Sequence, residues 1–481
     1  MTALVFVHGW SVTDTAVYGE MPQRLQQAAA AAGLALEPID LRLSEYVSFN
    51  DAVTMKDLVR GFDHALRDLQ LAGPSFVCVA HSAGGPVVRE WLRAQRDAPA
   101  LHCALRLEHL VMLAPANFGS ALARLGTGEL ERMRAWLQGV QPGLPILDWL
   151  ELGSPSSLSL NLDFIHGADP LASGQFQFVL AGDRPDRSLY DALVPYTGED
   201  GSDGVVRIAA ANLNACHAVL AVQDGARLDG DDALSLTLQR GPRCAFKMIA
   251  GASHSGPAHG ILTSAAPLTV ATIVRCLQVR DAAGYAALCE AFDRENAQRD
   301  ADKVELEPAG PFPPRVHIHD PCSQVIVRLT DEAGYPLVGA GCLFTAGPQA
   351  SPDHMPPGFM LDRQTNSRAP DTATLYLDYS LLAGDARVAD PRNPRRTLRA
   401  AVPSHRPYGA IIRPADLAGL VHHALARSVP GDDLFDLLAP HQTTVLDVVL
   451  PRKLHAGVFR LTADLAPQDF SHPVPGPLIG G

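Results

Sequence analysis

The stretch VCVAHSAGGP, residues 77–86, presents a serine in surroundings that suit nucleophilic chemistry. An apolar, β-type segment runs directly into Ser82, and very small residues follow it. Small side chains permit a sharp strand-to-helix turn with a hydroxyl at its apex, although an ordinary glycine-rich connection has the same composition. A serine hydroxyl is a poor nucleophile at neutral pH unless an imidazole takes its proton and a carboxylate holds that imidazole. The rest of the chain must therefore supply a histidine and an acid.

Two acids and two histidines that follow the serine are the candidates for these roles. Asp203, in GEDGSDGVVR, is the preferred acid because it heads an apolar run in a turn after a predicted strand, and Asp183 is the alternative. His254, in AGASHSG, is the preferred base because it stands closest to the end of the last predicted strand, and His259 is the alternative. The order serine, acid, histidine is the one expected in folds that carry such a turn.

Backbone N–H groups are needed as well, because negative charge develops on the carbonyl oxygen during acyl transfer. The N–H of Ala83 follows the candidate nucleophile directly and is one expected donor. The second donor is expected from HGWS, residues 8–11, which follows the first predicted strand. Trp10 is the preferred source of this N–H, and Gly9 is the alternative.

Short apolar runs rich in β-formers alternate with helical patterns over the first part of the chain, which predicts a parallel sheet wrapped by helices. Helices are expected at residues 18–32 and 54–71 and directly after the serine. Ser82 then lies at the carboxyl end of a strand, the edge at which open α/β sheets bind ligands. The predicted strands are residues 3–8, 34–40, 75–80, 107–114, 175–181 and 245–251.

Residues 119–172 interrupt this alternation with a segment rich in glycine, proline, serine and apolar side chains. If the segment is a lid or an acyl pocket, Trp136 and Trp149 are the expected substrate contacts. A satellite hydrophobic core explains the same composition, so both interpretations stay open.

The chain changes character beyond a first domain that we assign to residues 1–290. The charged stretch 291–314 is predicted to be a linker, residues 315–465 a β-sandwich-like accessory domain, and residues 466–481 a tail. This second region contains an arginine-rich segment that fits a solvated loop, with contact to anionic lipid headgroups as the less usual alternative. The four arginines are Arg392, Arg395, Arg396 and Arg399.

Composition limits the classes of partner. The 481 residues carry a formal net charge of −13 at pH 7, which argues against nucleic acid because phosphate binding requires a basic surface. The eight cysteines form no C-x-x-C pair, and His317 and His319 lack a third ligand nearby, so we expect no disulfide framework, no metal and no cofactor. Since no apolar stretch reaches transmembrane length and the N-terminus lacks a signal-peptide pattern, we expect a cytoplasmic protein, or alternatively an effector secreted without a leader.

The motifs AHSAGG, VHGW, LAPANFGS and SDGVVR together resemble bacterial α/β-hydrolases of the lipase and esterase type, in a branch similar to GPI inositol-deacylase-like and phospholipase-like proteins. The resemblance covers roughly the predicted first domain and implies the α/β-hydrolase fold. It also implies Ser82 as nucleophile, Asp203 as orienting acid and His254 as base, with Trp10 and Ala83 in the oxyanion hole.

We therefore expect a serine carboxylic-ester hydrolase that cleaves a hydrophobic acyl ester, such as a lipid, through an acyl-enzyme intermediate. Peripheral contact with a membrane would fit such a substrate. A thioesterase or an amidase would use the same three residues. The alternative from a different class is a non-catalytic interaction protein built on a relict hydrolase fold.

Overall fold

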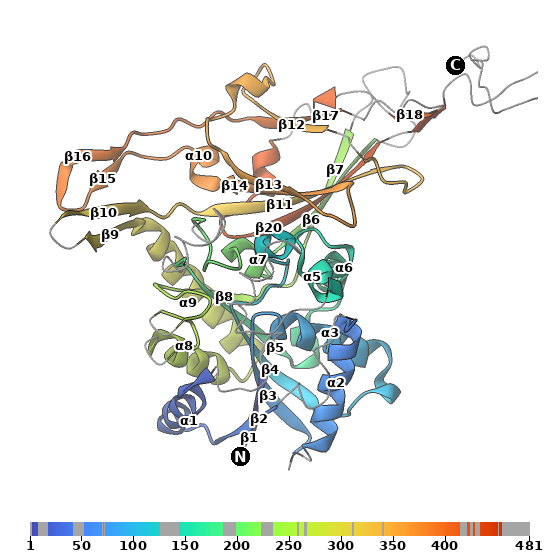
Figure 1. Cartoon of the computed structure of the whole chain (residues 1–481), viewed down its shortest axis with the longest axis vertical. Coiled ribbons are helices and arrows are strands. Elements are labelled where there is room, and N and C mark those ends of the chain that lie inside the picture. The colour runs from blue at the N-terminus through green and yellow to red at the C-terminus, as the bar shows by residue number, and fades with distance from the viewer. Residues whose placement is uncertain are drawn as a thin grey trace, which may run out of the picture.

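The structure is a computed structural model of the whole chain. A parallel sheet with helices on both faces forms one half of the molecule, and β-rich layers form the other half (Figure 1). The described residues are 2–7, 18–41, 52–69, 71, 73–125, 144–185, 199–222, 234–256, 259–263, 267–309, 312–338, 341–413, 421–423, 427–428, 433–450 and 452–454.

The parallel sheet has the strand order β2-β1-β3-β4-β5-β8, and every neighbouring pair in it is parallel. All six predicted strands are present. In five of these strands the central residues are almost completely buried, as expected of a sheet covered on both faces, whereas Pro38 and Ile39 of the edge strand β2 are only half-buried. The strands are β1 (Thr2–Val7), β2 (Leu36–Asp40), β3 (Ser75–His81), β4 (Arg106–Leu113), β5 (Phe176–Gly182) and β8 (Ala245–Ile249).

Two groups of helices cover the two faces of this sheet. One face packs on α2 (Met55–Asp68) and α3 (Gly84–Asp97), and the other on α1 (Met21–Ala31), α8 (Pro267–Leu277) and α9 (Ala282–Ala301). The start of α2 is where it was predicted, because Thr54 and Asp57 form a capping box in which each side chain accepts from the backbone N–H of the other residue. The mostly parallel sheet with flanking helices is the predicted α/β architecture.

The insertion between β4 and β5 is partly helical where the structure describes it. It contains η4 (Ala121–Leu125), α5 (Leu144–Leu150), α6 (Pro155–His166) and η5 (Pro170–Ser173), while η3 (Pro99–Leu101) precedes β4. Side chains of α5 and α6 join the apolar cluster beneath α2 and α3. This part of the insertion extends the core.

The predicted linker, residues 291–314, is not an irregular connection. Its first part is the second half of α9, and the rest enters a hairpin of β9 (Val304–Ala309) with β10 (Phe312–Ile318). The high charge of the stretch suggested a solvated linker, but Phe292 and Asn296 are buried against β8, where Asn296 bonds backbone groups of Phe246 and Met248. A single buried face was enough to order a segment whose other faces are charged.

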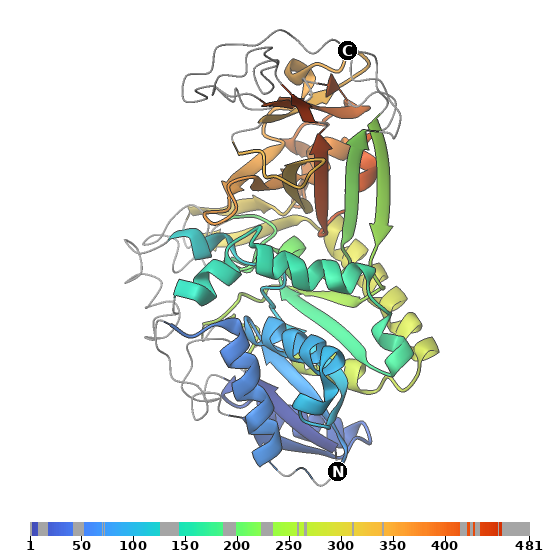
Figure 2. The same cartoon turned by 90° about the vertical axis from the view of Figure 1, so that its right-hand side faces the viewer.

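A second six-stranded sheet has the order β13-β14-β11-β20-β6-β7 and mixes parallel with antiparallel pairs. Two of its strands come from inside the range 1–290, and Figure 2 shows this pair, in green, rising beside the later strands. The domain boundaries remain predictions, but the sheet draws on both ranges. Its strands are β13 (Met360–Thr365), β14 (Thr372–Asp378), β11 (Cys322–Asp331), β20 (Thr443–Leu450), β6 (Cys216–Val222) and β7 (Leu234–Arg240).

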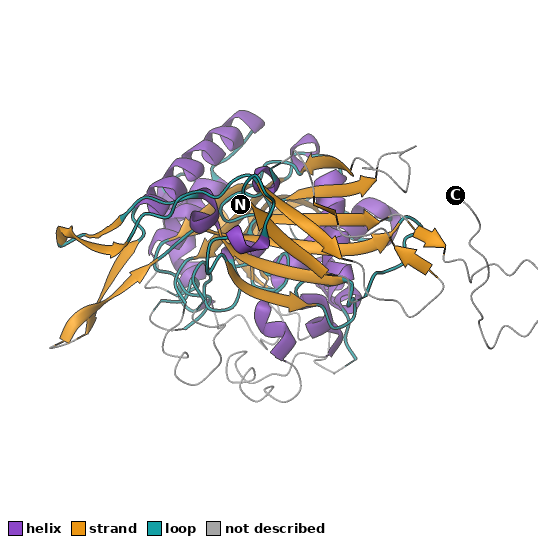
Figure 3. Ribbon diagram, turned by 90° about the horizontal axis from the view of Figure 1, so that it is seen from above, coloured by secondary structure: helices purple, strands orange, loops and turns teal. Residues whose placement is uncertain are grey.

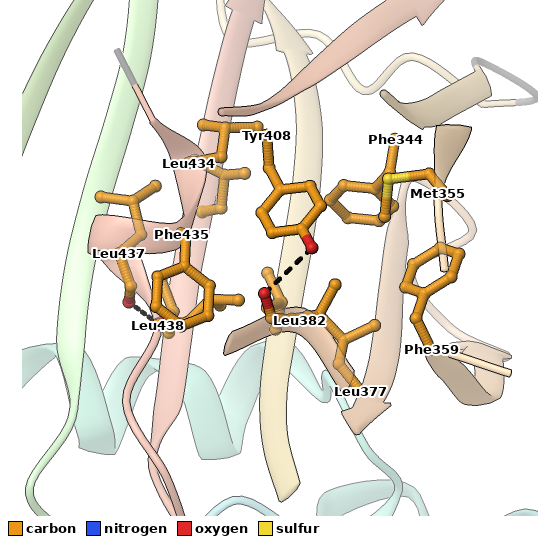
Figure 4. A pocket seen from close by; sticks show the side chains of 13 residues that line it. Phe344, Met355, Phe359, Leu377, Leu382, Tyr408, Leu434, Phe435, Leu437 and Leu438 are labelled. Atoms are coloured by element: carbon orange, nitrogen blue, oxygen red, sulfur yellow. Dashed lines mark hydrogen bonds between the residues drawn. The ribbon is translucent and has the colours of Figure 1, made fainter. Parts of the chain in front are cut away.

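A three-stranded sheet of β12 (Gly341–Ala346), β17 (Tyr408–Arg413) and β19 (Arg427–Ser428) packs over the second sheet, with α10 (Tyr379–Ala383) and η8 (Leu434–Leu437) at the layer between them. This matches the predicted β-sandwich-like region. A small apolar pocket remains between the layers, and in Figure 4 aromatic and leucine side chains surround it while Tyr408 donates its hydroxyl hydrogen bond to the carbonyl of Leu382. The remaining elements are α7 (Ile208–Ala211), η7 (Pro352–His354), the hairpin β15–β16 (Val388–Asp390, Asn393–Arg399) and a two-stranded antiparallel sheet of β18 (Val421–His423) with β21 (Arg452–Leu454).

The arginine-rich segment forms strand β16, in a hairpin that projects from the β-rich half beside β9 and β10 (Figures 1 and 3). Arg392 and Arg396 pair with Asp390, and Arg399 pairs with two aspartates of neighbouring segments. Among the described residues no helix has the length and apolar character required to span a bilayer.

Candidate functional site

Ser82 stands at a sharp turn between β3 and α3. Its φ of 55° lies in the left-handed region, which a residue with a Cβ rarely adopts and which costs on the order of 1–3 kcal/mol. Its N–H bonds the carbonyl of Leu113 on β4 at 3.0 Å, so the neighbouring strand holds the turn in place. Gly85 is required here, because a Cβ at this position would lie 2.9 Å from Cβ of Pro115. The small residues therefore serve the predicted sharp turn, and the structure adds that its backbone is strained at Ser82.

His254 lies in the turn after β8, and its ring reaches the serine. Nε2 of His254 is 3.1 Å from Oγ of Ser82, and Nδ1 is 2.9 Å from Oδ2 of Asp203. Because a carboxylate only accepts, Nδ1 carries the proton and Nε2 is left to accept from the serine hydroxyl. The backbone joins the same partners, since the N–H of His254 donates to the carbonyl of Asp203 at 3.0 Å. The structure thus brings together the three preferred residues.

Asp203 is fixed from its other side. It is 1% exposed, and its Oδ1 accepts from the N–H groups of Val205 at 3.0 Å and Val206 at 2.8 Å. Oδ2 is left to face the imidazole. These bonds orient the carboxylate and compensate part of the cost of burying it.

The two alternatives lie elsewhere. Asp183 follows β5, but its carboxylate accepts from the N–H of Gly251 and pairs with Arg299 at 2.6 Å. His259 is exposed, and its carbonyl accepts from the N–H of Ser253. Asp183 therefore has a structural ion pair, and His259 is an exposed residue.

The expected oxyanion donors are only partly within the described residues. Ala83 is buried at the N-cap of α3, where backbone N–H groups have no partner within the helix. Gly9 and Trp10 lie outside the described residues, so the second donor stays a prediction.

Of the two predicted substrate contacts, Trp136 also lies outside the described residues. Trp149, on α5, is 5% exposed and belongs to the apolar cluster shared with α2 and α3. This packing agrees with the interpretation of the insertion as a satellite hydrophobic core. Contact of either tryptophan with substrate stays a prediction.

Three further residues shape the site, and His81 among them was expected from the sequence to pack or hydrogen-bond beside the nucleophile. His81 lies 4.8 Å from the ring of His254 by centroids, and its Nε2–H donates to the carbonyl of that residue at 3.1 Å. Ser120 donates to the carbonyl of Val205, and a Cβ at Gly182 would lie 2.2 Å from the carbonyl oxygen of Ala252. Gly182 directly follows the predicted strand 175–181 and ends the observed β5, a usual position for a close approach of backbones. Ser120 ends the quoted motif LAPANFGS, in which this residue had no assigned role.

All eight cysteines are free thiols, and burial raises the pKa of several of them, such as Cys244 to about 12. Among the described residues, no group of three or more histidine, cysteine, aspartate or glutamate side chains is placed to hold a metal ion. The chemical groups gathered at the turn are thus a hydroxyl, an imidazole and a carboxylate.

Comparison with solved structures relates the whole chain to one enzyme. The chain superposes on phospholipase PlaB from Legionella pneumophila with a TM-score of 0.82 and 34% identity, covering 98% of this chain and 97% of that one. A second structure of that phospholipase, in complex with thio-NAD, gives a TM-score of 0.81 and 33% identity over 99% of both chains. No family model and no curated protein sequence matches the chain. The level of identity and the coverage of both halves show that this chain belongs to the family of phospholipase PlaB, a family of lipolytic ester hydrolases with the α/β-hydrolase fold.

Proposed function

We propose that the protein is a serine hydrolase that cleaves the carboxylic ester of a phospholipid through Ser82, His254 and Asp203. The observation that carries this proposal is the continuous hydrogen-bond chain from the hydroxyl to the carboxylate, with 3.1 Å and 2.9 Å between its heavy atoms. The choice of a phospholipid rests on similarity to a phospholipase over both halves of the chain.

In the acylation step, Nε2 of His254 takes the proton of Ser82 as Oγ attacks the ester carbonyl. The N–H of Ala83 donates to the oxyanion, and Asp203 stabilises the imidazolium that forms. The tetrahedral intermediate collapses, its C–O bond to the alcohol breaks, and the imidazolium protonates the departing alcohol. An acyl ester on Ser82 remains.

Deacylation repeats the sequence with water as the nucleophile. His254 takes a proton from water, the hydroxide attacks the acyl carbonyl, and the proton then returns to Oγ of Ser82 as the fatty acid leaves. The strained turn favours both steps because it holds Oγ in the same place before and after acylation.

Ser82→Ala tests the proposal. This variant is expected to lose labelling by a fluorophosphonate and to lose phospholipid and soluble ester turnover by several orders of magnitude, with an unchanged melting temperature. Ser173→Ala is the matched control, because Ser173 lies on the surface in η5 and bonds only its own turn. Persistent turnover in Ser82→Ala would exclude this nucleophile.

The substrate class is tested with a panel of matched oxygen esters, thioesters and amides presented alone and in phosphatidylcholine vesicles. A preference for the oxygen ester in vesicles is expected. A preference for the thioester or the amide would favour the alternative activities of the same three residues. Failure to label and to turn over any member would support a non-catalytic interaction protein.

A further inference from the structure

The acid loop, residues 199–208, is held by a buried arginine in addition to its own turn. Arg207 is 1% exposed, and its Nε and Nη2 donate to the two carboxylate oxygens of Glu199, each at 2.8 Å. Nη2 also pairs with Asp362 on β13 at 2.5 Å. The guanidinium carbon lies 4.2 Å from the ring centroid of Tyr376 on β14. Two of these three partners belong to the second sheet.

The positive charge of Arg207 is paired with two carboxylates, those of Glu199 and Asp362. Burial alone would lower the pKa of Arg207. Glu199, Tyr376 and Asp362 together raise this pKa by more than burial lowers it, so the net shift is upward and the guanidinium stays charged. Burial raises the pKa of Glu199, and Arg207 opposes that increase. Buried ion pairs contribute little net stability because both charges lose their hydration, whereas their fixed geometry can hold two segments together.

The start of the acid loop is held by the same strand β14. The hydroxyl of Tyr376 lies 2.8 Å from the carbonyl oxygen of Asp200 and 3.0 Å from that of Gly201. Gly201 has a φ of +70°, and a Cβ on it would lie 2.4 Å from the tyrosine oxygen. Only glycine allows this approach.

The two held positions face each other across the turn that carries the acid. Ile208 donates its N–H to the carbonyl of Gly201 at 2.8 Å, and Ser202 pairs with Arg207 in an isolated bridge. Asp203 stands at the tip between them, where its N–H bonds the carbonyl of Val206. A shift of the base of this turn would therefore move the carboxylate relative to His254.

We propose that the second sheet positions Asp203 through Arg207, Glu199, Asp362 and Tyr376, a group that we name the Arg207 clamp. The inference rests on the proposed function of Asp203 and extends the site into the β-rich half. The clamp touches neither substrate nor reacting atoms, so its members are positioning residues. They act by keeping the distance between the carboxylate and Nδ1 of His254 short.

Tyr376→Phe and Arg207→Lys test the clamp on a soluble short-chain ester. The first removes one hydroxyl and keeps the ring beneath the guanidinium. The second replaces a planar fork of donors by a single ammonium that cannot bond Glu199 twice and Asp362 as well. Both are expected to lower kcat about tenfold or more with little change in KM, since the substrate contacts stay intact.

Ser367→Ala is the matched control. Ser367 also joins the two halves, through its N–H and hydroxyl to Glu151, but it does not contact the acid loop. The control is expected to keep kcat even if its melting temperature falls by as much as that of Tyr376→Phe. An equal loss of kcat in the control would overturn the proposal, because any loosening of the interface would then suffice.

The deciding measurement is a double-mutant cycle with Asp203→Asn. If Tyr376 acts through the carboxylate, Tyr376→Phe should lower kcat in the normal background and leave the residual kcat of Asp203→Asn unchanged. The same fold-loss in both backgrounds would show a merely structural role and overturn the clamp. Normal activity of Asp203→Asn itself would refute the proposed acid instead, so the two failures are distinguishable. Asp362→Asn replaces Arg207→Lys in this series if the lysine variant does not fold.

Discussion

The two six-stranded sheets of this protein are built in opposite ways. The first sheet, β2-β1-β3-β4-β5-β8, is entirely parallel, and its first four strands in the chain alternate with covering helices. The second sheet joins β6 to β20 in parallel register, with Cys216 opposite Thr444. It therefore requires segments more than two hundred residues apart in the chain to meet.

This difference shows which residues of the candidate site each half of the molecule positions. Ser82 and His254 follow strands of the first sheet. The loop that carries Asp203 is instead hydrogen-bonded to Tyr376 on β14 of the second sheet. Apolar packing continues across the same junction, because Ile326 and Val445 of the second sheet belong to the cluster beneath α2 and α3. The β-rich half is thus part of the structure that surrounds the acid.

The largest expected effect concerns the residues that the first sheet positions. His254→Ala should lower kcat/KM for a soluble ester by about 10⁵-fold or more, because its Nε2 is the group that takes the proton of Ser82. His259→Ala is the control, and it should stay within about twofold because this residue is exposed. Steady-state kinetics with both variants decides between the histidines, and a reversed pattern would contradict the proposed base.

An intermediate effect concerns the junction. Ile326→Ala is expected to lower the free energy of unfolding by about 2–5 kcal/mol, because the side chain is fully buried. If the two halves unfold together, calorimetry should show one transition that moves as a whole. The half-buried Ile411 on β17 is the control site, and its alanine variant should lose less stability. Two separate transitions, with only one of them shifted, would show that the halves are independent.

The smallest effect is a pH dependence confined to the second half. Burial raises the pKa of Asp378 to about 6, against about 3.9 in an unfolded chain. The stability associated with this group is therefore fully present below about pH 4 and is lost as the pH rises through 6. Asp378→Asn keeps an acceptor for the N–H of Leu381, so its melting temperature should exceed that of the parent protein at pH 7 and not at pH 4.

Asp447 provides the comparison of opposite sign. Burial raises the pKa of Asp447, but His217 and Arg328 together lower it by more than burial raises it. The net shift is therefore downward. Its stabilisation is present above about pH 4 and is lost at lower pH. The melting temperature of Asp447→Asn should therefore fall most at pH 7 and approach that of the parent protein near pH 3. The same pH trend in both variants would contradict these assignments.

Local sequence determined the first sheet and the turn at Ser82. Apolar β-type runs predicted β1 to β5 and β8, and the small residues after Ser82 predicted the sharp turn, because both features depend on near neighbours. The preference for Asp203 over Asp183 and for His254 over His259 followed from their positions relative to strand ends. The geometry agrees with both preferences, while Gly9, Trp10 and Trp136 lie outside the described residues.

Tertiary contacts decided what has no local signature. The charges of residues 291–314 resembled those of a linker, yet one buried face makes the first part a helix. The sequence did not predict β6 or its pairing with β20, and Arg207 stood in the quoted motif SDGVVR without an assigned role. The sequence by itself determined the backbone bend and the order of the reacting groups, because these depend on side-chain size and position along the chain. Only the tertiary structure decided which sheet holds the acid, because that depends on pairings and buried charges between distant segments.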